Sequence, residues 1–266
     1  MVGGTWFEQR TFGVRCEWGV AGAGALAPGS ACVVVVDVLS FTTSVSVAVD
    51  AGTRVFPFPW RDDRAADFAA AENAVLAVGR RAVTEQAPWS LSPAALRRAP
   101  AVPRLVLPSP NGSAISAAVT GIPVLAASLR NATAVARWIR RQGWGTADRP
   151  VAVIAAGEQW PGRGALRPSI EDLLGAGAVV SALSAAGAGP LSPESTIART
   201  AFESTDDIAA ALAECSSGRE LRDRGFADDV TIAGEVDVSK AVPLRADGAF
   251  AHVELIRASS PAATVS

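Results

Sequence analysis

Asp37 follows an almost unbroken run of β-branched residues in the segment VVVVDVLSFTTS. Four of the seven residues after it carry a hydroxyl side chain. A carboxylate at the end of a buried strand can hold a hard cation or act as a nucleophile. Ser40, Thr42 and Thr43 fall where the next helix is expected to begin, and hydroxyls and free N–H groups at a helix N-terminus can bind phosphate. The alternative is that Ser40 or Thr42 only caps the helix, which would contribute about 1 kcal/mol.

Two further segments repeat this order of strand, polar loop and helix. In LVLPSPNGSAIS, Asn111 can cap or bind, Gly112 permits close approach of the backbone, and Ser113 adds a hydroxyl. In VLAASLRNATAV, Arg130 could balance an anionic ligand, and Asn131 stands beside it. Both patterns also fit an ordinary turn followed by an N-cap, so substrate binding and plain capping stay open at these loops.

The segment after the hydrophobic run VAVIA combines acids, arginines and glycines. Glu158 follows the expected strand and is a candidate general base. Arg163 and Arg167 lie in the loop beyond it, where they suit an acidic substrate. We therefore expect this loop to lie at the same edge of the sheet as the other candidate site residues.

Glu171 and Asp172 are adjacent carboxylates at the start of the next expected helix. Together with Asp37 they could form an oxygen-ligand site for Mg²⁺. Ser169 precedes Asp172 by three residues, which resembles a capping box and offers a structural alternative. A fifth segment, SSGRELRDRGFADDV, is highly charged and favours a solvated surface helix with a glycine C-cap.

The composition narrows the chemistry. The 266 residues include 24 basic and 26 acidic ones, one histidine, one lysine and no tyrosine, and 49% are hydrophobic. This balance excludes a disordered chain, and the lack of a basic cluster argues against nucleic-acid binding. Three scattered cysteines without a C-x-x-C pair argue against structural zinc and disulfides. Because the N-terminus also lacks an apolar signal core, we expect a cytoplasmic protein.

Other familiar arrangements are missing from the sequence. It contains no phosphate-binding G-x-x-x-x-G-K-[ST] loop and no G-x-S-x-G nucleophile elbow. Asp37 has no second aspartate two residues on, so the D-x-D pair of haloacid-dehalogenase-type phosphatases is absent. The longest uncharged stretch, 173–193, contains four glycines and predicts a tightly packed buried helix with its exit loop rather than a membrane span.

The elements that must position these residues alternate along the chain. Strands are expected at 32–38, 53–58, 105–107, 122–126 and 150–155, with weak ones at 241–244 and 249–255. Helices are expected at 42–51, 62–78, 112–119, 131–142, 170–186, 206–216 and 219–224. This alternation predicts an α/β fold with a mostly parallel or mixed central sheet between two helical layers, and ligands beyond the carboxyl ends of the strands. We expect one domain over 1–266, with a subdomain junction or long loop near 85–103.

The motifs DVLSFTT, PNGSA, S-x-x-NA-x-AVA, AGE…SIEDLLGAGA and SGRELRDRGF-x-x-DV occur in this order. The ordered set resembles the 2-phosphosulfolactate phosphatase (ComB) family over most of the chain. The resemblance implies a three-layer α/β/α fold unrelated to haloacid dehalogenases. It also implies Mg²⁺-dependent hydrolysis of a phosphate monoester on a sulfonated three-carbon acid.

The sequence departs from that family at arginine positions. Family members often have D-V-L-R-A-[ST]-T-T, where this chain has Ser40 in place of the arginine. The family pattern T-T-N-G-T-R-A is SPNGSAI here, so a second arginine is missing. A family G-E-R-x-G segment is expected near 82–86, where the chain has AVTEQ. Arg130, Arg163 and Arg167 are the candidates to compensate.

We therefore expect a Mg²⁺-dependent phosphatase acting on a small anionic phosphate ester, without nucleic-acid or membrane partners and with a homo-oligomer as one option. Asp37, Glu171 and Asp172 would hold the metal, and these three with Glu158 would be catalytic. The expected substrate ligands are Ser40, Thr42, Thr43, Asn111, Gly112, Ser113, Arg130, Asn131, Arg163 and Arg167. Direct attack by water and an aspartyl-phosphate on Asp37 both stay open. The alternatives are a non-catalytic anion-binding protein and a phosphatase for another small phosphorylated acid.

Overall fold

A computed structural model describes residues 5–59, 63–162 and 164–259 of the chain. Its centre is a sheet with the strand order β1-β7-β2-β6-β10-β11-β3-β5-β4. The strands of this sheet are β1 (Val14–Trp18), β2 (Cys32–Val36), β3 (Arg54–Phe58), β4 (Val75–Leu76), β5 (Arg104–Pro108), β6 (Val124–Ala127), β7 (Val151–Ala155), β10 (Pro243–Ala246) and β11 (Ala249–His252). A separate small ribbon pairs β8 (Glu158–Gln159) with β9 (Leu166–Arg167).

The sheet consists of two parallel blocks joined by an antiparallel hairpin. β1, β7, β2 and β6 form the first block, and β3, β5 and β4 form the second. The β10–β11 hairpin lies between them, with β10 antiparallel to β6 and β11 antiparallel to β3. Three successive antiparallel pairings give the two blocks opposite senses within the sheet.

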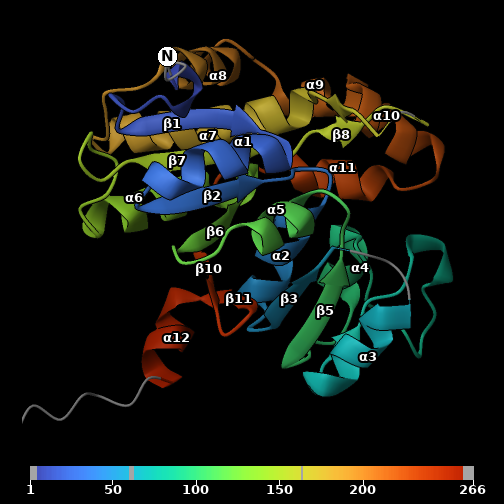
Figure 1. Cartoon of the computed structure of the whole chain (residues 1–266). Coiled ribbons are helices and arrows are strands. Elements are labelled where there is room, and N and C mark those ends of the chain that lie inside the picture. The colour runs from blue at the N-terminus through green and yellow to red at the C-terminus, as the bar shows by residue number, and fades with distance from the viewer. Residues whose placement is uncertain (1–4, 60–62, 163, 260–266) are drawn as a thin grey trace, which may run out of the picture.

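Twist brings the carboxyl ends of β2 and β5 together despite their opposite senses. Neighbouring strands rotate by roughly 20–25°, so the five steps from β2 to β5 sum to roughly 100–125°. In Figure 1, β1, β2 and β7 run across the view while β5 runs up it. The loops that follow β2 and β5 can therefore meet, and these are the loops that contain the predicted site residues.

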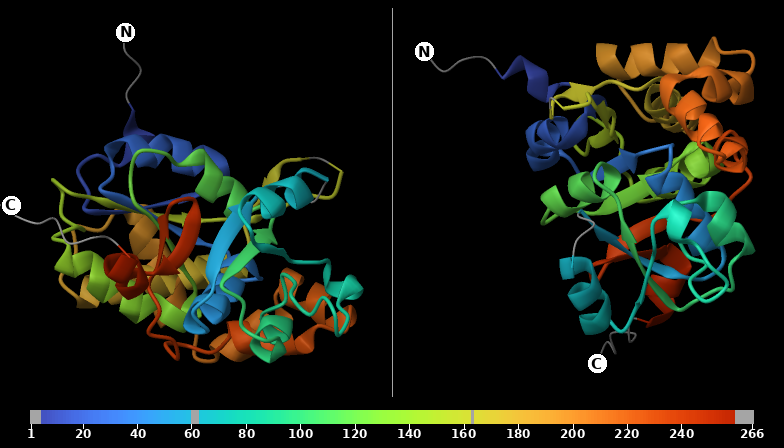
Figure 2. Two further views of the ribbon diagram at one scale, coloured as in Figure 1. Left: turned by 90° about the horizontal axis from the view of Figure 1, so that it is seen from below. Right: turned by 90° about the vertical axis from the view of Figure 1, so that its right-hand side faces the viewer.

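β2 is fully buried because its two faces contact different hydrophobic cores. Val34 and Val36 belong to the core under α6 (Ala132–Arg141) and α7 (Ile170–Ala185). Val33 and Val35 belong to the core on the opposite face. That face is covered by α1 (Gly19–Leu26), α2 (Phe41–Asp50) and α5 (Gly112–Ala118), and α8 (Pro193–Glu203) packs against α7. The three-layer α/β/α prediction is confirmed, as the two further views of Figure 2 also show.

The remaining helices surround the sheet at its edges and ends. They are α3 (Asp63–Ala71), α4 (Pro93–Arg98), α9 (Ile208–Glu214), α10 (Ser216–Asp223), α11 (Ala227–Ala233) and α12 (Val253–Ser259), with the short 3₁₀ turns η1 (Trp6–Glu8), η2 (Ala27–Gly29), η3 (Arg80–Ala82) and η4 (Leu129–Asn131). No helix in the described part of the chain is long and apolar enough to cross a membrane. The uncharged stretch 173–193 instead forms most of α7 and its exit loop, as expected.

Two predicted elements are wrong in part. The helix expected at 62–78 ends after Ala71, because the chain turns at Asn73 with a positive φ of 47°, and Val75–Leu76 then pairs with β5. Asparagine is one of the few non-glycine residues that adopts this conformation readily. The strand expected at 249–255 stops at His252, and α12 begins at Val253.

Several elements were missed by the sequence analysis, namely β1, α1, α4, α8 and α11. The segment 85–103 is not a plain loop, because it contains α4, whose N-cap Ser92 accepts a hydrogen bond from the Ala95 amide. Ser92 and Pro93 together are an N-cap followed by a proline at the first helical position, which could have indicated this helix. A division into subdomains at 85–103 stays a prediction.

Candidate active site

Asp37 lies where the ends of β2 and β5 meet. Its Oδ1 accepts a hydrogen bond from the Phe41 amide at 3.1 Å, and its Oδ2 accepts one from the Gly112 amide at 2.8 Å. A Cβ on Gly112 would lie 2.4 Å from Cδ1 of Phe41 and 2.8 Å from that Oδ2. Only glycine therefore allows the second block to approach Asp37 so closely.

Most of the hydroxyls expected to bind phosphate instead donate hydrogen bonds to backbone carbonyls nearby. Thr42 Oγ1 donates to the Asp37 carbonyl at 2.9 Å, and Thr43 Oγ1 donates to the Val38 carbonyl at 2.7 Å. Ser113 Oγ donates to the Leu107 carbonyl at 3.3 Å, and all three side chains are buried. Their hydrogen bonds fix the two loops.

Asp172 is held by donors from three separate segments. Its Oδ1 accepts from the Val38 amide at 2.7 Å, and its Oδ2 accepts from the Gly157 amide at 2.8 Å and from Ser169 Oγ at 2.9 Å. Burial, together with the neighbouring acids Asp37 and Glu171, raises the pKa of Asp172 well above its ordinary value. The expected Ser169–Asp172 contact exists, but it joins the two side chains instead of completing a capping box.

Two glutamates complete an acidic group around Asp37. Burial raises the pKa of Glu158 to about 7, and the charges of Asp37 and Glu171 add to this effect. Asn111 Nδ2 donates to Glu158 Oε2 at 3.0 Å. Burial also raises the pKa of Asp37, with a further contribution from Glu171. Oε2 of Glu171 is buried and has no hydrogen-bond partner among the described residues, so one oxygen of this acidic group is left unsatisfied.

A cleft of about 510 Å³ opens beside these acids. Its polar lining comes from both blocks and from outside the sheet, and includes Asp37, Ser40, Arg80, Asn111, Glu158 and Arg224. A second hollow of about 610 Å³ is lined by Glu158 and by Glu171, Arg167 and Trp160 among others. Glu158 therefore lines both hollows.

Arg80 is the functional candidate that the sequence analysis missed. It comes from η3, and its guanidinium donates to Ser40 Oγ at 2.8 Å. Its charge also opposes the rise in the pKa of Asp37. The pair Gly79–Arg80 stands just before the stretch 82–86, where the family pattern places an arginine. Arg224, at the end of α10, is the second cation that lines this cleft and was also missed.

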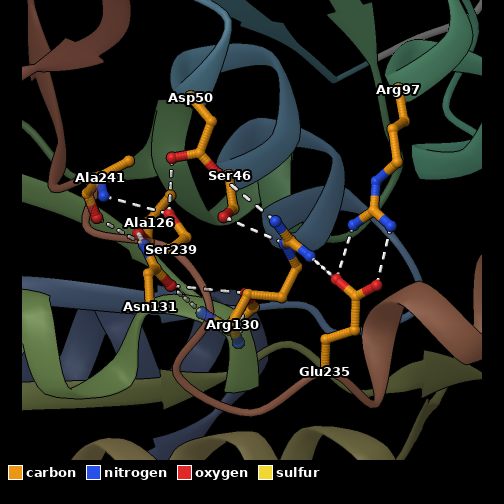
Figure 3. A network of polar contacts seen from close by, with 10 residues as sticks. Ser46, Asp50, Arg97, Ala126, Arg130, Asn131, Glu235, Ser239 and Ala241 are labelled. Carbon is orange, nitrogen blue, oxygen red and sulfur yellow. Dashed lines mark hydrogen bonds and ion pairs between the residues drawn. The ribbon is translucent and has the colours of Figure 1, made fainter.

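The predicted substrate arginines are placed differently. Arg167 lines the second hollow, donates to Ser217 Oγ at 3.3 Å and lowers the pKa of Glu158 by its charge. Arg163 lies outside the described residues. Arg130 is not brought to the cleft: its buried side chain contacts Ser46, Asp50 and Glu235 (Figure 3).

Asn131 also lies away from the cleft. Its Oδ1 accepts from the Ser128 amide at 2.9 Å, and its Nδ2 donates to the Ala241 carbonyl at 3.1 Å (Figure 3). A capping box between Ser128 and Asn131 is present. The geometry of this loop therefore fits plain capping by Asn131, which was the alternative to substrate binding.

The charged segment expected to form a solvated helix is partly buried, which corrects that expectation. It splits into α10 and α11, and Asp229 in the first turn of α11 is only 1% exposed. Asp229 Oδ2 accepts from Arg80 Nε at 3.0 Å. A surface helix would have left Asp229 in solvent, so this segment contributes to the wall of the cleft through Arg80.

The chain also matches a known protein family. Residues 24–248 match the family model described as 2-phosphosulpholactate phosphatase. The chain belongs to this family. Members of the 2-phosphosulpholactate phosphatase family are phosphoric monoester hydrolases, so the resemblance noted in the sequence is confirmed and the protein is a phosphatase of this class.

Membership in the 2-phosphosulpholactate phosphatase family agrees with the cleft, because a small phosphate ester fits within it. In the part of the chain that the structure describes, no group of three His, Cys, Asp or Glu side chains is arranged to hold a metal ion. Asp37, Glu171 and Asp172 are near one another, but they do not form a ready cage.

Proposed function

We propose that the protein hydrolyses 2-phosphosulfolactate to sulfolactate and phosphate with the help of Mg²⁺. The observation that carries the proposal is that one cleft is lined both by the acids Asp37 and Glu158 and by the cations Arg80 and Arg224. A phosphate ester that bears further anionic groups needs both kinds of group. Its phosphoryl group would approach the acids with a bridging cation, and its sulfonate or carboxylate would face the arginines.

The donor set suits Mg²⁺ in one specific way. Oε2 of Glu171 is buried without a partner, and the acids around it raise one another's pKa. A hard cation would satisfy that oxygen and stabilise the ionised carboxylates. Mg²⁺ in phosphate sites commonly uses one or two carboxylates together with waters and substrate oxygens, so a three-ligand cage is not required. We propose Asp37 and Glu171 as its ligands; when bound, the ion would neutralise phosphoryl charge.

Asp172, the third expected ligand, has a different part in the proposal. Its two oxygens accept three hydrogen bonds from Val38, Gly157 and Ser169, and it lines neither hollow. We assign it to holding the ends of β2 and β7 and the start of α7 in register. It would orient Glu171 and Asp37 without touching the substrate.

Glu158 is the proposed general base. A carboxyl with a pKa of about 7 is partly ionised at neutral pH and can take a proton from water. As the water oxygen bonds to phosphorus, its proton passes to Glu158 and the ester P–O bond breaks. The departing alkoxide takes a proton from solvent and Glu158 releases the proton that it accepted to solvent, so charge and atoms balance. Both oxygens of Asp37 already accept backbone N–H groups, which favours water over Asp37 as the nucleophile.

The direct test measures phosphate release from 2-phosphosulfolactate in EDTA and after Mg²⁺ is added back. We expect release only with Mg²⁺. 2-Phospholactate lacks the sulfonate and should show a higher KM, and Arg80→Gln should reduce the difference between the two esters. No release from any small phosphate monoester in Mg²⁺ would contradict the proposal.

A non-catalytic anion-binding protein is the rival function. It predicts that 2-phosphosulfolactate raises the melting temperature without turnover, with or without Mg²⁺. The cytoplasmic location and the possible homo-oligomer stay predictions. The three cysteines, Cys16, Cys32 and Cys215, are free and buried, which agrees with a reducing compartment.

A further inference from the structure

Asp229 is a buried acid that the proposed chemistry does not use. It lies in the first turn of α11 and is 1% exposed. Its Oδ1 accepts from Ser92 Oγ and from the Ala94 amide at the start of α4. Its Oδ2 accepts from Arg80 Nε at 3.0 Å. One carboxylate thus joins a helix N-terminus to the arginine that lines the cleft.

Arg80 is held on three sides. Asp229 binds Nε, Ser40 accepts from one Nη at 2.8 Å, and the guanidinium carbon lies 5.7 Å from the centre of the Phe226 ring. A guanidinium has five N–H donors, and these contacts occupy two of them. The remaining donors belong to the two Nη atoms, which are the atoms that form a fork for an oxyanion. The contact between Nε and Asp229 therefore sets the direction in which the two Nη atoms of Arg80 point.

We propose that Asp229 is a positioning residue that aims Arg80 at the anionic group of the substrate. This inference rests on the proposed function, because Arg80 is taken there to bind the sulfonate or carboxylate end. Without the charge-assisted contact to Asp229, Arg80 would keep only Ser40 and Phe226. A flexible arginine side chain then loses part of its preorganisation, and anion binding weakens.

A purely structural role for Asp229 makes a different prediction. α11 is also attached to its surroundings at its other end, where Glu235 accepts two hydrogen bonds from Arg97 of α4 at 2.7 and 2.6 Å (Figure 3). α11 and α4 therefore stay connected when Asp229 is changed conservatively. Asp229→Asn keeps an acceptor for Ser92 and Ala94 but presents an amide without charge to Arg80.

The test measures the affinity of the folded protein for sulfolactate by titration calorimetry. Sulfolactate has the carboxylate and sulfonate but no phosphoryl group, so binding needs no turnover. Asp229→Asn should weaken binding about tenfold or more, which is roughly the effect of losing one charge-assisted hydrogen bond. Asp228→Asn is the matched control, since Asp228 is the neighbouring residue, is exposed and pairs with Arg98 at the surface. Binding by this control should equal that of the wild type.

A double-mutant cycle separates positioning from a general loss of packing. If Asp229 acts through Arg80, Asp229→Asn should weaken sulfolactate binding no further once Arg80→Gln is present. Ser92→Ala removes one of the two α4 contacts to Asp229 together with the N-cap hydrogen bond from Ala95, and it should lower the melting temperature without changing the affinity. Equal affinity of Asp229→Asn and wild type, additive effects in the cycle, or loss of affinity in Ser92→Ala would each overturn the inference.

The outcomes for the inference and for the proposed function can be told apart. Phosphate release by the wild type is measured separately. If the wild type binds sulfolactate but releases no phosphate, only the hydrolytic function is contradicted. Absence of sulfolactate binding by the wild type would overturn the positioning inference. In steady-state assays, Asp229→Asn should raise KM for 2-phosphosulfolactate with kcat little changed.

Discussion

Two charged regions of the molecule are organised in opposite ways. Around Asp37, four carboxylates lie close together, and burial raises the pKa of Asp37, Glu158 and Asp172. Around Arg130, acids and arginines alternate, and the contact with Arg97 lowers the pKa of Glu235 (Figure 3). In the first region acidic groups face one another and, among the described residues, one buried oxygen has no hydrogen-bond partner, whereas charges in the second are paired.

The difference distinguishes a region suited to catalysis from a region that supports the structure. Paired charges need nothing further, so the Arg130 region can serve to connect α2, η4 and the end of α11. Like charges buried together are unfavourable unless a proton or a cation joins them. Their retention at the ends of β2 and β7 therefore indicates a site that binds such a partner. Candidate functional acids can be recognised here as buried carboxyl groups whose acidic neighbours raise their pKa.

The largest expected effect comes from breaking the acidic region. Asp37→Asn should lower kcat/KM by roughly 10²–10⁴-fold, the range for removing a catalytic acid–base or electrostatic group. The free energy of unfolding should change by less than about 1 kcal/mol, because relief of like-charge repulsion offsets a mismatched hydrogen bond at Gly112. Phosphate release and urea unfolding measure the two quantities. Retention of full activity would remove Asp37 from the mechanism.

The next effect comes from breaking the paired region. Arg130→Met should lower the free energy of unfolding by about 2–3 kcal/mol, less than for a fully buried pair because Asp50 and Glu235 reach solvent. Arg98→Met, which breaks only the exposed pair with Asp228, should change it by less than about 1 kcal/mol. Urea midpoints measure both. If Arg130 bound substrate, as the sequence suggested, KM would also rise; on the structure we expect KM to stay unchanged.

The last expected effect is a pH dependence that sharpens the comparison. The folded protein binds the Glu158 proton more tightly than the unfolded chain, because its pKa is about 7 instead of the ordinary 4.5. This contribution to stability is complete below about pH 4.5 and is lost as the pH rises to about 7. Glu235 has the opposite sign: its lowered pKa stabilises the fold above the ordinary value, and this is lost as the pH falls.

Urea unfolding in EDTA between pH 4.5 and 8 measures this dependence. Glu158→Gln should flatten the fall in stability between pH 4.5 and 7, and Mg²⁺ should reduce that fall in the wild type. In assays with Mg²⁺, the rate should rise with pH through the titration of Glu158, and the variant should lack this rise. An unchanged stability profile in Glu158→Gln would show that Glu158 does not titrate in this range.

The sequence predicts the part of the site that depends on local pattern. The run CVVVV predicts a strand buried on both faces, so Asp37 is recognisable as its terminal acid. Asn111 and Gly112 are recognisable as the polar turn after the next long hydrophobic run. Glu171 and Asp172 stand at a helix start, where acids are favoured by the helix dipole.

The rest depends on contacts that local pattern does not encode. Asp172 bonds to the Val38 amide, 134 positions away in the sequence, and this long-range contact decides its structural role. Arg80 sits in a short 3₁₀ turn without hydrophobic periodicity, so nothing nearby marks it as part of the cleft. Arg130 looked suitable because it follows a strand, yet its acidic partners come from α2 and from the end of α11.

The origin of Arg80 outside the sheet has a consequence for how the selectivity of this fold can change. Asp37 and Glu158 follow β2 and β7, and Glu171 lies in the first turn of α7, all beside the packed cores, whereas Arg80 comes from the segment between β4 and α4. Surface segments accept insertions and substitutions that strand ends do not. Replacing residues 79–88 as a cassette would therefore change which anionic tail is accepted while leaving the hydrolytic acids in place. Selection could retune the choice of substrate in the same way, one loop at a time.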